Sequence, residues 1–347
     1  MRPVYQLNSE LYKVTGIQRV MMDIHEALKP FGAKIIGTVP MEKVSKDLGI
    51  NESDYIQFNG YGRLKGSVVI VHERRYLPIF WVLNKILRFD IELIYVHHNE
   101  LYGQRLLSRF PKHIVAISDA GIKNLTEYFG VKREYISKIH NCVRKPDGFS
   151  AKRKEFNPEE ITILYPARIN SVKRQVEIVR NLRGKLSDKV RILFAGEGPE
   201  YEELQKECGD STQFVALGFR ADVPELMQQS DFMMLYSRHE GLPISLIEAT
   251  MTGTPIICNN VGGNCEIAFD GRNALVPESW EELTQTLNLL PELSKETYAS
   301  MSRASVEVYE RYYRFEKFAD GYRRLIKQLE CGHRRRSAQR DFPNPYI

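Results

Sequence analysis

The sequence contains few cysteines, and they follow none of the usual spacings. None of the five belongs to a C-x-x-C pair, and an odd number cannot all be paired with one another. Disulfide-stabilised secreted domains and structural zinc modules depend on such patterns. The sequence therefore argues against both classes, and we expect free thiols in a reducing cytoplasm.

Long apolar runs are also missing. No stretch comes near the roughly 18 consecutive apolar residues of a membrane-spanning helix, and the first residues hold no apolar segment typical of a secretory signal. With 43% hydrophobic and 27% charged residues, the composition is that of a folded globular protein. Because 347 residues exceed what one hydrophobic core usually holds, we expect two domains.

Charge is distributed unevenly along the chain, whose net charge is +5. Residues 1–150 have an excess of Lys and Arg, whereas residues 151–330 have an excess of Asp and Glu. A basic first half would concentrate anionic partners such as phosphates or lipid headgroups, but it can also be an ordinary solvated surface. Only dispersed charge and the Arg334–Arg336 run favour nucleic acid, so we expect no nucleic-acid partner.

The second half alternates short β-rich runs with helical patterns. The β-rich runs are Ile161–Tyr165, Val190–Ala195, Phe214–Leu217, Phe232–Tyr236 and Pro255–Cys258. Near-continuous apolar strands separated by helices indicate a parallel sheet that is covered on both faces. Helices are expected, for example, over Lys173–Leu182 and Glu200–Cys208.

The first half shows the same rhythm less clearly. Its expected strands are Val4–Leu7, Lys34–Thr38, Ser67–Val71, Glu92–Val96 and His113–Ile117, and its expected helices are Ile17–Leu28 and Asp119–Phe129. We predict an N-terminal Rossmann-like domain over 1–150, a C-terminal one over 151–312, an amphipathic helix over 313–330 and a basic mobile tail over 331–347. The polar segment Lys145–Pro158 is the predicted linker. Two such domains would bind ligands in a cleft at the carboxyl ends of their strands.

The most informative segment runs from Ser237 to Ala249, after a strand and into a helix. Pro243 suits the first turn of a helix, and free N–H groups there bind anions with the help of the helix dipole. Gly241 permits a close approach of the backbone to a ligand. Glu240 and Glu248 can each accept hydrogen bonds from two neighbouring hydroxyls, which suits one hexose and one ribose. The alternative is that Glu240 caps the helix and Glu248 is a surface charge.

The segment E-G-L-P-I-S-L-I-E-A that begins at Glu240, followed by Gly253-Thr254-Pro255, resembles the retaining glycosyltransferases of family 4. Landmarks in the same order include Gly196–Pro199, Gly218-Phe219 and Val261–Gly263. The resemblance implies the α/β fold called GT-B, in which two doubly wound domains face each other across a cleft. It also implies a C-terminal helix that crosses back to the first domain.

The resemblance implies a role for each matching residue. Arg168 and Lys173 would grip the diphosphate of the donor, and these two cations would stabilise the leaving group without a metal. No Asp-x-Asp triplet occurs, so we expect no metal and no cofactor beyond the nucleotide-sugar co-substrate. Glu240 and His97 complete the expected catalytic set. The expected substrate-binding set is Gly16, Gly196, Gly241, Leu242, Pro243, Ile244, Glu248, His98 and Gly263.

Some of these assignments leave alternatives open. Either His97 or His98 could reach the donor sugar, and a histidine at a strand end is often only structural. Arg168 and Lys173, taken singly, would ordinarily be solvated surface residues. The donor base can be uridine or guanosine.

The implied activity is retaining transfer of a hexosyl group from a nucleoside-diphosphate donor to a hydroxyl of a glycan or lipid-linked acceptor, in cell-surface polysaccharide synthesis. The first alternative is a nucleotide-sugar epimerase of the same fold, which the spacing of Glu240 and Glu248 disfavours. The second is a nicotinamide- or nucleotide-binding oxidoreductase. That class usually has G-x-G-x-x-G, and the segment Gly196–Tyr201 lacks the third glycine.

The segment Arg74–Arg88 combines apolar and aromatic residues with flanking cations. Such a helix can lie at the surface of an anionic membrane and meet a lipid-linked acceptor. The alternative is a helix buried against the first sheet. We therefore expect a cytoplasmic protein that can associate peripherally with the inner face of the membrane.

Overall fold

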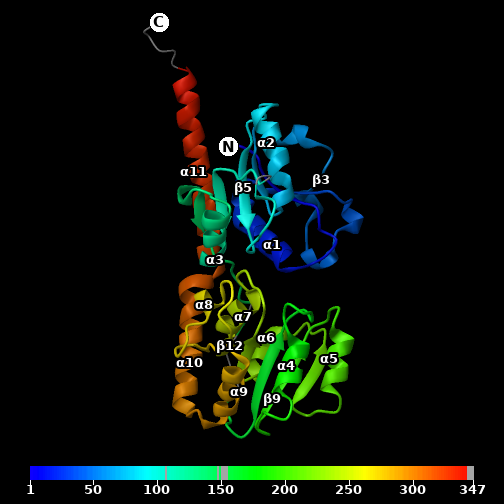
Figure 1. Ribbon diagram of the computed structural model, residues 1–347. Coiled ribbons are helices and arrows are strands. Elements are labelled where there is room, and N and C mark those ends of the chain that lie inside the picture. The colour runs from blue at the N-terminus through cyan, green and yellow to red at the C-terminus, as the bar shows by residue number, and fades with distance from the viewer. Residues whose placement is uncertain (106–107, 147, 150–154, 342–347) are drawn as a thin grey trace. The chain divides into compact units, whose positions relative to one another are not determined.

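The computed structural model describes residues 1–105, 108–146, 148–149 and 155–341 (Figure 1). The chain divides into two compact units. The first unit comprises Met1–Cys142 and Phe315–Ile347, and the second comprises Val143–Arg314. The predicted linker Lys145–Pro158 lies partly outside the described residues.

The second unit begins earlier than residue 151 because the chain binds to it by backbone contacts at Val143. The Val143 N–H donates to the Tyr313 carbonyl at 3.2 Å, and the Tyr309 hydroxyl donates to the Val143 carbonyl at 3.0 Å. These contacts join the two ends of the second unit.

A seven-stranded parallel sheet forms the centre of the first unit, in the order β3-β2-β1-β4-β5-β6-β7. Its strands are β1 (Val4–Asn8), β2 (Lys34–Gly37), β3 (Tyr55–Gln57), β4 (Val68–Val71), β5 (Glu92–His97), β6 (His113–Ala116) and β7 (Ile136–Lys138). Its helices are α1 (Gly16–Leu28), α2 (Leu77–Lys85), α3 (Asp119–Lys123) and α11 (Phe315–Asp341). Every strand expected from the sequence is present, but β3 and β7 were not predicted because each is short and carries polar residues, with the sequences YIQ and ISK.

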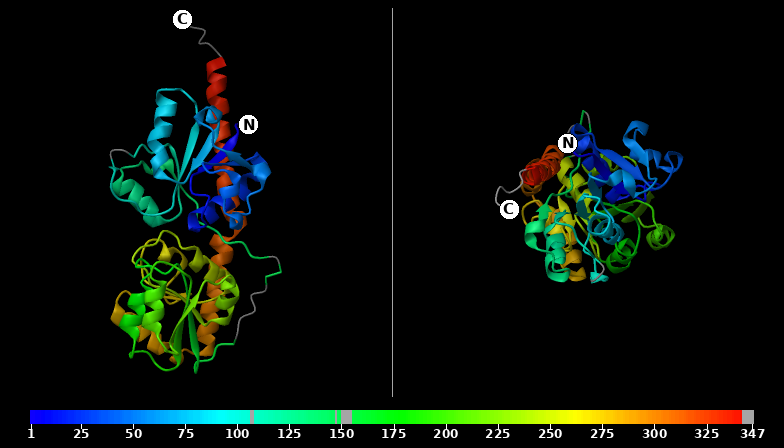
Figure 2. Two further views of the ribbon diagram at one scale, coloured as in Figure 1. Left: turned by 90° about the vertical axis from the view of Figure 1, so that its right-hand side faces the viewer. Right: turned by 90° about the horizontal axis from the view of Figure 1, so that it is seen from above.

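The second unit contains a six-stranded parallel sheet in the order β10-β9-β8-β11-β12-β13. Its strands are β8 (Ile161–Pro166), β9 (Val190–Ala195), β10 (Phe214–Gly218), β11 (Phe232–Leu235), β12 (Ile256–Cys258) and β13 (Ala274–Leu275). Its helices are α4 (Gln175–Leu182), α5 (Tyr201–Cys208), α6 (Val223–Gln229), α7 (Ile244–Thr252), α8 (Asn264–Ile267), α9 (Trp280–Leu289) and α10 (Lys295–Val308). Helices cover both faces of each sheet (Figure 2).

The strand order reverses direction once in each sheet. In the second unit this point lies between β8 and β11, which are neighbours in the sheet although two strands separate them in the sequence. Doubly wound sheets bind ligands beyond the carboxyl ends of their strands at such a point. The loops after β8 and β11 are therefore the first place to look for a site.

The long helix α11 belongs to the first unit, as the resemblance implied. It packs against α1 (Figure 1), where the Arg323 guanidinium donates to the Ala27 carbonyl at 2.9 Å. The expected mobile tail from residue 331 is wrong as far as Asp341, because α11 continues to that residue. The segment after Cys331 contains four arginines, which favour helix, and its first proline comes only at Pro343. Residues 342–347 lie outside the described residues.

No helix in the described ranges is both long and apolar enough to span a lipid bilayer. The five cysteines are free thiols; Cys142, Cys208 and Cys258 are buried, and Cys331 is exposed.

Candidate active site

The loop after β11 carries Glu240, whose side chain is only 7% exposed. One Glu240 carboxylate oxygen lies 2.5 Å from the Lys173 ammonium, which is itself 22% exposed. Lys173 comes from the loop after β8, so the two adjacent strands at the reversal point bring these side chains together. The sequence predicted both residues as functional, but it did not predict that they pair.

A buried tyrosine at the end of β8, Tyr165, binds the loop that carries Lys173 by a hydrogen bond. The Tyr165 hydroxyl donates to the Lys173 carbonyl at 2.6 Å and accepts from the Tyr236 N–H at 3.0 Å. Burial raises the pKa of Tyr165 well above its ordinary value, so the hydroxyl keeps its proton. This one hydroxyl ties the loop after β8 to the end of β11.

Replacing Tyr165 with Phe should therefore weaken both the fold and the site. Removal of the hydroxyl leaves a buried carbonyl and a buried N–H without this partner, which costs about 1–3 kcal/mol of unfolding free energy. Urea denaturation measures that loss, and we expect the affinity for a nucleoside diphosphate to fall with it. Tyr312→Phe, at a 37% exposed tyrosine, is the matched control and should change neither quantity.

Arg174 follows Lys173 and adopts a left-handed backbone conformation with φ of 59°. Its guanidinium lies over the Trp280 ring, 4.4 Å from the centroid, and donates to Glu177 at 3.1 Å. A left-handed non-glycine residue is unfavourable by itself, and these contacts hold it in place. The sequence analysis missed Arg174 because its role depends on a ring more than a hundred residues away.

Arg168 is exposed in the same loop, and within the described part of the chain its guanidinium forms no ion pair. Its backbone is fixed by the buried Gln175, whose side-chain amide donates to the Arg168 carbonyl at 3.2 Å. The glycine-rich turn after β9 packs directly on this loop. A Cβ atom at Gly196 would lie 2.2 Å from the Ala167 carbonyl oxygen, and one at Gly198 would lie 2.0 Å from that of Ile169.

The close approach gives Gly196 a packing role that explains why glycine stands there. Its expected contact with substrate stays a prediction. The loop with Arg168 can only adopt its position if the neighbouring turn has no side chain.

Helix α7 begins immediately after the Glu240 loop. Pro243 is the N-cap residue of α7, with φ of −72° and ψ of 124°. It therefore lies one position before the first turn, whereas the sequence predicted it within that turn. The proline still suits this place because it has no N–H to satisfy. Gly241, Leu242 and Pro243 are buried, and Ile244 opens the helix, whose first N–H groups have no partner within the helix. Glu248 lies on the second turn of α7 and is half-buried.

A second glycine turn, after β12, touches the backbone of Glu240 itself. Gly262 has φ of 55°, and a Cβ atom there would lie 1.9 Å from the Glu240 carbonyl oxygen. The next residue, Gly263, donates its N–H to the Gly241 carbonyl at 2.8 Å. Gly262 therefore cannot carry a side chain unless the Glu240 backbone moves. The expected contact of Gly263 with the substrate stays a prediction.

In the first unit, Gly16 begins α1 and is exposed. The helix start is capped, since the Gln18 side-chain oxygen accepts the Thr15 N–H at 3.2 Å. His97 ends β5 and is fully buried, with its Nδ1 3.4 Å from the Tyr95 hydroxyl. His98 stacks on His72, and His98 Nε2 lies 2.9 Å from His72 Nδ1. The roles of Gly16, His97 and His98 in donor binding stay predictions.

Burial keeps these three imidazoles neutral. It lowers the pKa of His72 to about 3 and that of His97 to about 4, and it lowers the pKa of His98 well below its usual value. Within the described ranges, the His97 Nε2 atom is buried without a hydrogen-bond partner. A neutral His97 can donate or accept one hydrogen bond there.

The buried histidines should make stability depend on pH. Below the unfolded pKa of about 6.5 the unfolded chain takes up protons that the folded chain does not, so stability is complete above that pH and is lost toward pH 4. When the pH is lowered from 7.5 to 5.5, the unfolding free energy of the parent should fall. That of His98→Asn should fall by about 1 kcal/mol less. Urea denaturation at the two pH values measures this difference. His239→Asn, at an exposed histidine, should behave like the parent.

No three His, Cys, Asp or Glu side chains lie close enough to hold a metal ion anywhere in the described part of the chain. Arg168 and Lys173 are cations of the loop after β8, and Lys173 pairs with Glu240 in the loop before α7.

Residues 148–307 match the family model described as Glycosyl transferases group 1. The chain is therefore similar to this family over 160 residues, just under half of its length. The match lies almost entirely in the second unit, so the loops with Arg168, Lys173 and Glu240 belong to the group 1 glycosyltransferase segment. It agrees with the resemblance to family 4.

Two curated proteins are similar to parts of the chain. The chain is 26% identical over 252 residues to N-acetyl-alpha-D-glucosaminyl L-malate synthase of Bacillus anthracis, which covers 69% of this chain and 61% of that protein. It is 34% identical over 86 residues to UDP-Gal:alpha-D-GlcNAc-diphosphoundecaprenol alpha-1,3-galactosyltransferase of Escherichia coli, covering 23% and 22%. The matched segments therefore span only part of these relatives.

Among solved structures, Anabaena Alr3699/HepE in complex with UDP has the same fold. The TM-score is 0.78 at 18% sequence identity, with 95% of this chain and 100% of that chain covered. The chain thus has the GT-B type of α/β fold, as predicted.

Proposed function

We propose that this glycosyltransferase moves a hexosyl group, with retention, from a nucleoside-diphosphate donor to a hydroxyl of a glycan or lipid-linked acceptor in cell-surface polysaccharide synthesis. The observation that carries the proposal is the ion pair between the buried Glu240 and Lys173 beside the N-terminus of α7. It places an anion, a cation and free N–H groups at the reversal point of one sheet.

The pair suggests how the donor would be received. The diphosphate would bind at the α7 N-terminus and to Arg168, and Lys173 would turn from Glu240 toward a phosphate oxygen. Glu240 would then be free to accept hydrogen bonds from the donor sugar. Glu248, on the second turn of α7, would bind the ribose. Because HepE binds UDP, we propose uridine as the donor base.

In the transfer itself, the bond between the anomeric carbon and the diphosphate oxygen breaks, and its electron pair leaves with the diphosphate. Arg168 and Lys173 would stabilise that negative charge without a metal ion. Glu240 would balance the positive charge that develops on the sugar. The acceptor hydroxyl would attack from the same face and lose its proton to the departing phosphate oxygen, so the configuration is retained.

Thermal unfolding with nucleotides tests the donor site. UDP at 100 times its dissociation constant should raise the unfolding free energy by about 2.7 kcal/mol, with GDP and UMP stabilising less. Lys173→Met should remove most of the UDP effect, whereas Lys189→Met, at an exposed lysine, should keep it. Equal stabilisation of both variants would contradict the assignment. Retention would be read from the anomeric configuration of the product by NMR.

We further propose that the exposed face of α2 contacts an anionic membrane. Leu77, Phe80 and Leu83 of α2 pack into the core of the first unit, which agrees with the alternative of a buried helix for that side only. The other side of α2 and the residues directly after it leave large apolar side chains in solvent, among them Trp81 at 43%, Ile86 at 64% and Leu87 at 54% exposed. Lys85 and Arg88 are exposed beside them, and the Arg109 guanidinium lies over the Trp81 ring.

This combination favours an interfacial helix, since apolar side chains would enter the headgroup region while cations meet anionic lipid. Peripheral binding at the cytoplasmic face would bring the enzyme to a lipid-linked acceptor.

Vesicle sedimentation decides the membrane proposal. The parent protein should sediment with phosphatidylglycerol vesicles at low salt and not with phosphatidylcholine vesicles. Trp81→Ser combined with Ile86→Ser should reduce binding at least fivefold, because each side chain removes about 2 kcal/mol of apolar transfer. Phe219→Ser, at a 71% exposed aromatic residue of the second unit, is the control and should bind like the parent. Parent protein that stays in the supernatant would end the proposal.

A further inference from the structure

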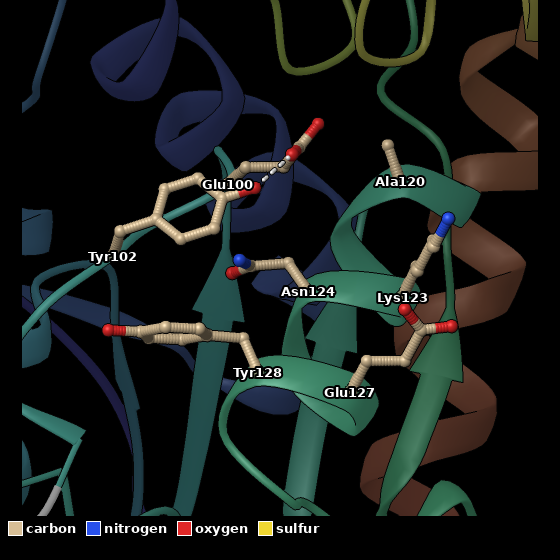
Figure 3. Close-up of a pocket in the computed structure, with 7 residues that line it drawn as sticks. All are labelled: Glu100, Tyr102, Ala120, Lys123, Asn124, Glu127 and Tyr128. Atoms are coloured by element: carbon tan, nitrogen blue, oxygen red, sulfur yellow. Dashed lines mark hydrogen bonds between the residues drawn. The ribbon is translucent and has the colours of Figure 1, made fainter.

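The first unit contains a cavity of about 370 Å³ just beyond the carboxyl end of β5. It is lined by Glu100, Tyr102, Lys123, Asn124, Glu127 and Tyr128 (Figure 3). None of these residues was singled out by the sequence analysis. The cavity lies at the ligand-binding edge of a parallel sheet. Its first lining residue, Glu100, follows His97 by three positions in the sequence.

The cavity has a rigid frame. The Asn124 side chain accepts the Leu101 N–H at 3.0 Å and donates to the Leu101 carbonyl at 2.9 Å, which ties the loop after β5 to the helix. The Gly103 N–H donates to the Tyr128 hydroxyl at 2.7 Å. Ser118 caps α3 by accepting the Gly121 N–H at 3.1 Å. The two walls are therefore held together by hydrogen bonds before any ligand arrives.

The helical wall has an unusual backbone. Directly after α3, residues Asn124–Tyr128 form a π-helix. Such turns are rare and occur frequently at functional sites, because the wider turn moves side chains out of their normal register. Three of the lining residues lie on this turn. In Figure 3 the rings of Tyr102 and Tyr128 lie on one side of Asn124, and Lys123 and Glu127 lie on the other.

The lining combines an aromatic face with polar groups of both signs. Tyr102 is 64% exposed, yet its hydroxyl is fixed by donation to Glu100 at 2.9 Å. Its ring meets that of Tyr128 edge to face, with 5.1 Å between the centroids. Within the described part of the chain, Lys123 and Glu127 form no ion pair, so both remain available to a ligand.

We propose that this cavity binds one neutral pyranose unit of the acceptor. An oriented, exposed tyrosine ring can cover the apolar C–H face of a sugar, while carboxylates accept from hydroxyls and an ammonium donates to them. Two carboxylates and one ammonium disfavour a phosphate or a uronic acid, since an anion there would meet net negative charge. This inference rests on the proposed transferase function.

Saturation-transfer NMR with simple glycosides tests the inference on the full chain. The probes are the methyl glycosides of glucose, galactose and N-acetylglucosamine, with methyl glucuronide as the anionic counterpart. At least one neutral glycoside should bind, and the glucuronide should bind at least fivefold more weakly. Binding of none of the neutral probes, or equal binding of the glucuronide, would overturn the proposal.

Two variants locate the binding. Tyr102→Ala and Glu127→Gln should each weaken the neutral glycoside at least fivefold, whereas Tyr312→Ala and Glu134→Gln, at exposed positions elsewhere, should not. Unchanged binding in both cavity variants would also overturn it. UDP stabilisation of the same samples distinguishes failure of the transferase proposal from failure of this inference. A parent protein that UDP does not stabilise contradicts the transferase proposal. UDP binding without cavity-dependent glycoside binding contradicts this inference alone.

Discussion

Replacing Glu240 with Gln is expected to lower turnover of the nucleotide sugar by about a thousandfold, or about 4 kcal/mol of transition-state stabilisation. Gln keeps the size of the side chain and can still hydrogen-bond a hydroxyl. It cannot balance the positive charge that develops on the sugar. Turnover of UDP-sugars by UDP release measures the effect.

The same substitution should not weaken binding of UDP. Lys173 lies 2.5 Å from Glu240 in the parent, and without that carboxylate its ammonium is released toward the diphosphate. We expect the affinity for UDP to be equal to that of the parent or up to about tenfold higher. The reason is that the Glu240 carboxylate no longer competes with the diphosphate for the Lys173 ammonium. Weaker UDP binding would contradict the donor exchange that we propose.

Glu203→Gln is the matched control for Glu240. This carboxylate also pairs with a cation, the Arg180 guanidinium at 2.8 Å, but both side chains are about half exposed. It should retain full turnover. More than a tenth of the parent turnover in Glu240→Gln would remove Glu240 from the chemistry.

Gly262→Ala is expected to have the largest effect on the fold around the site. The new Cβ would lie 1.9 Å from the Glu240 carbonyl oxygen and 2.7 Å from its carbonyl carbon, and the backbone φ of 55° is unfavourable for alanine. One of the two loops must move. We expect a loss of about 3 kcal/mol or more in unfolding free energy, measured with urea, together with loss of turnover.

Gly271→Ala isolates the strain from the clash. Gly271 has φ of 68°, in the same left-handed region, but nothing lies within 4 Å of a Cβ atom there. It should cost only about 1 kcal/mol and leave turnover intact. Equal losses in the two variants would mean that the contact with Glu240 contributes nothing.

Much of the fold could be predicted from the sequence because the signal was local. Runs such as Val190–Ala195 are mostly apolar and are bounded by turn residues such as Asp188 and Gly196, and the alternation of strand and helix leaves few topologies. The two-residue strand β13 was missed because it is too short for a period to show, and the three-residue strands β3 and β7 were missed because polar residues interrupt them, unlike the apolar β12. Pro243 was misplaced by one residue, as helix ends are the least certain positions.

The candidate site was predicted in its members but not in its arrangement. Glu240, Lys173 and Arg168 could be named because they match a family motif in order and spacing. Their support could not, since Tyr165, Gln175, Arg174 and Gly262 act through individual contacts with backbone atoms or rings, which no sequence pattern contains. The same holds for the cavity of the first unit, whose walls are two segments joined by Asn124.

By itself the sequence determined that the chain is a parallel α/β protein of two halves, with one glutamate in the loop before a helix and another within that helix, because periodicity and residue type are local properties of the chain. The tertiary structure alone decided which partners meet. It placed Glu240 on Lys173, pressed Gly262 against the Glu240 backbone and exposed one apolar side of α2. Such contacts depend on the order and register of strands, which a local pattern does not contain.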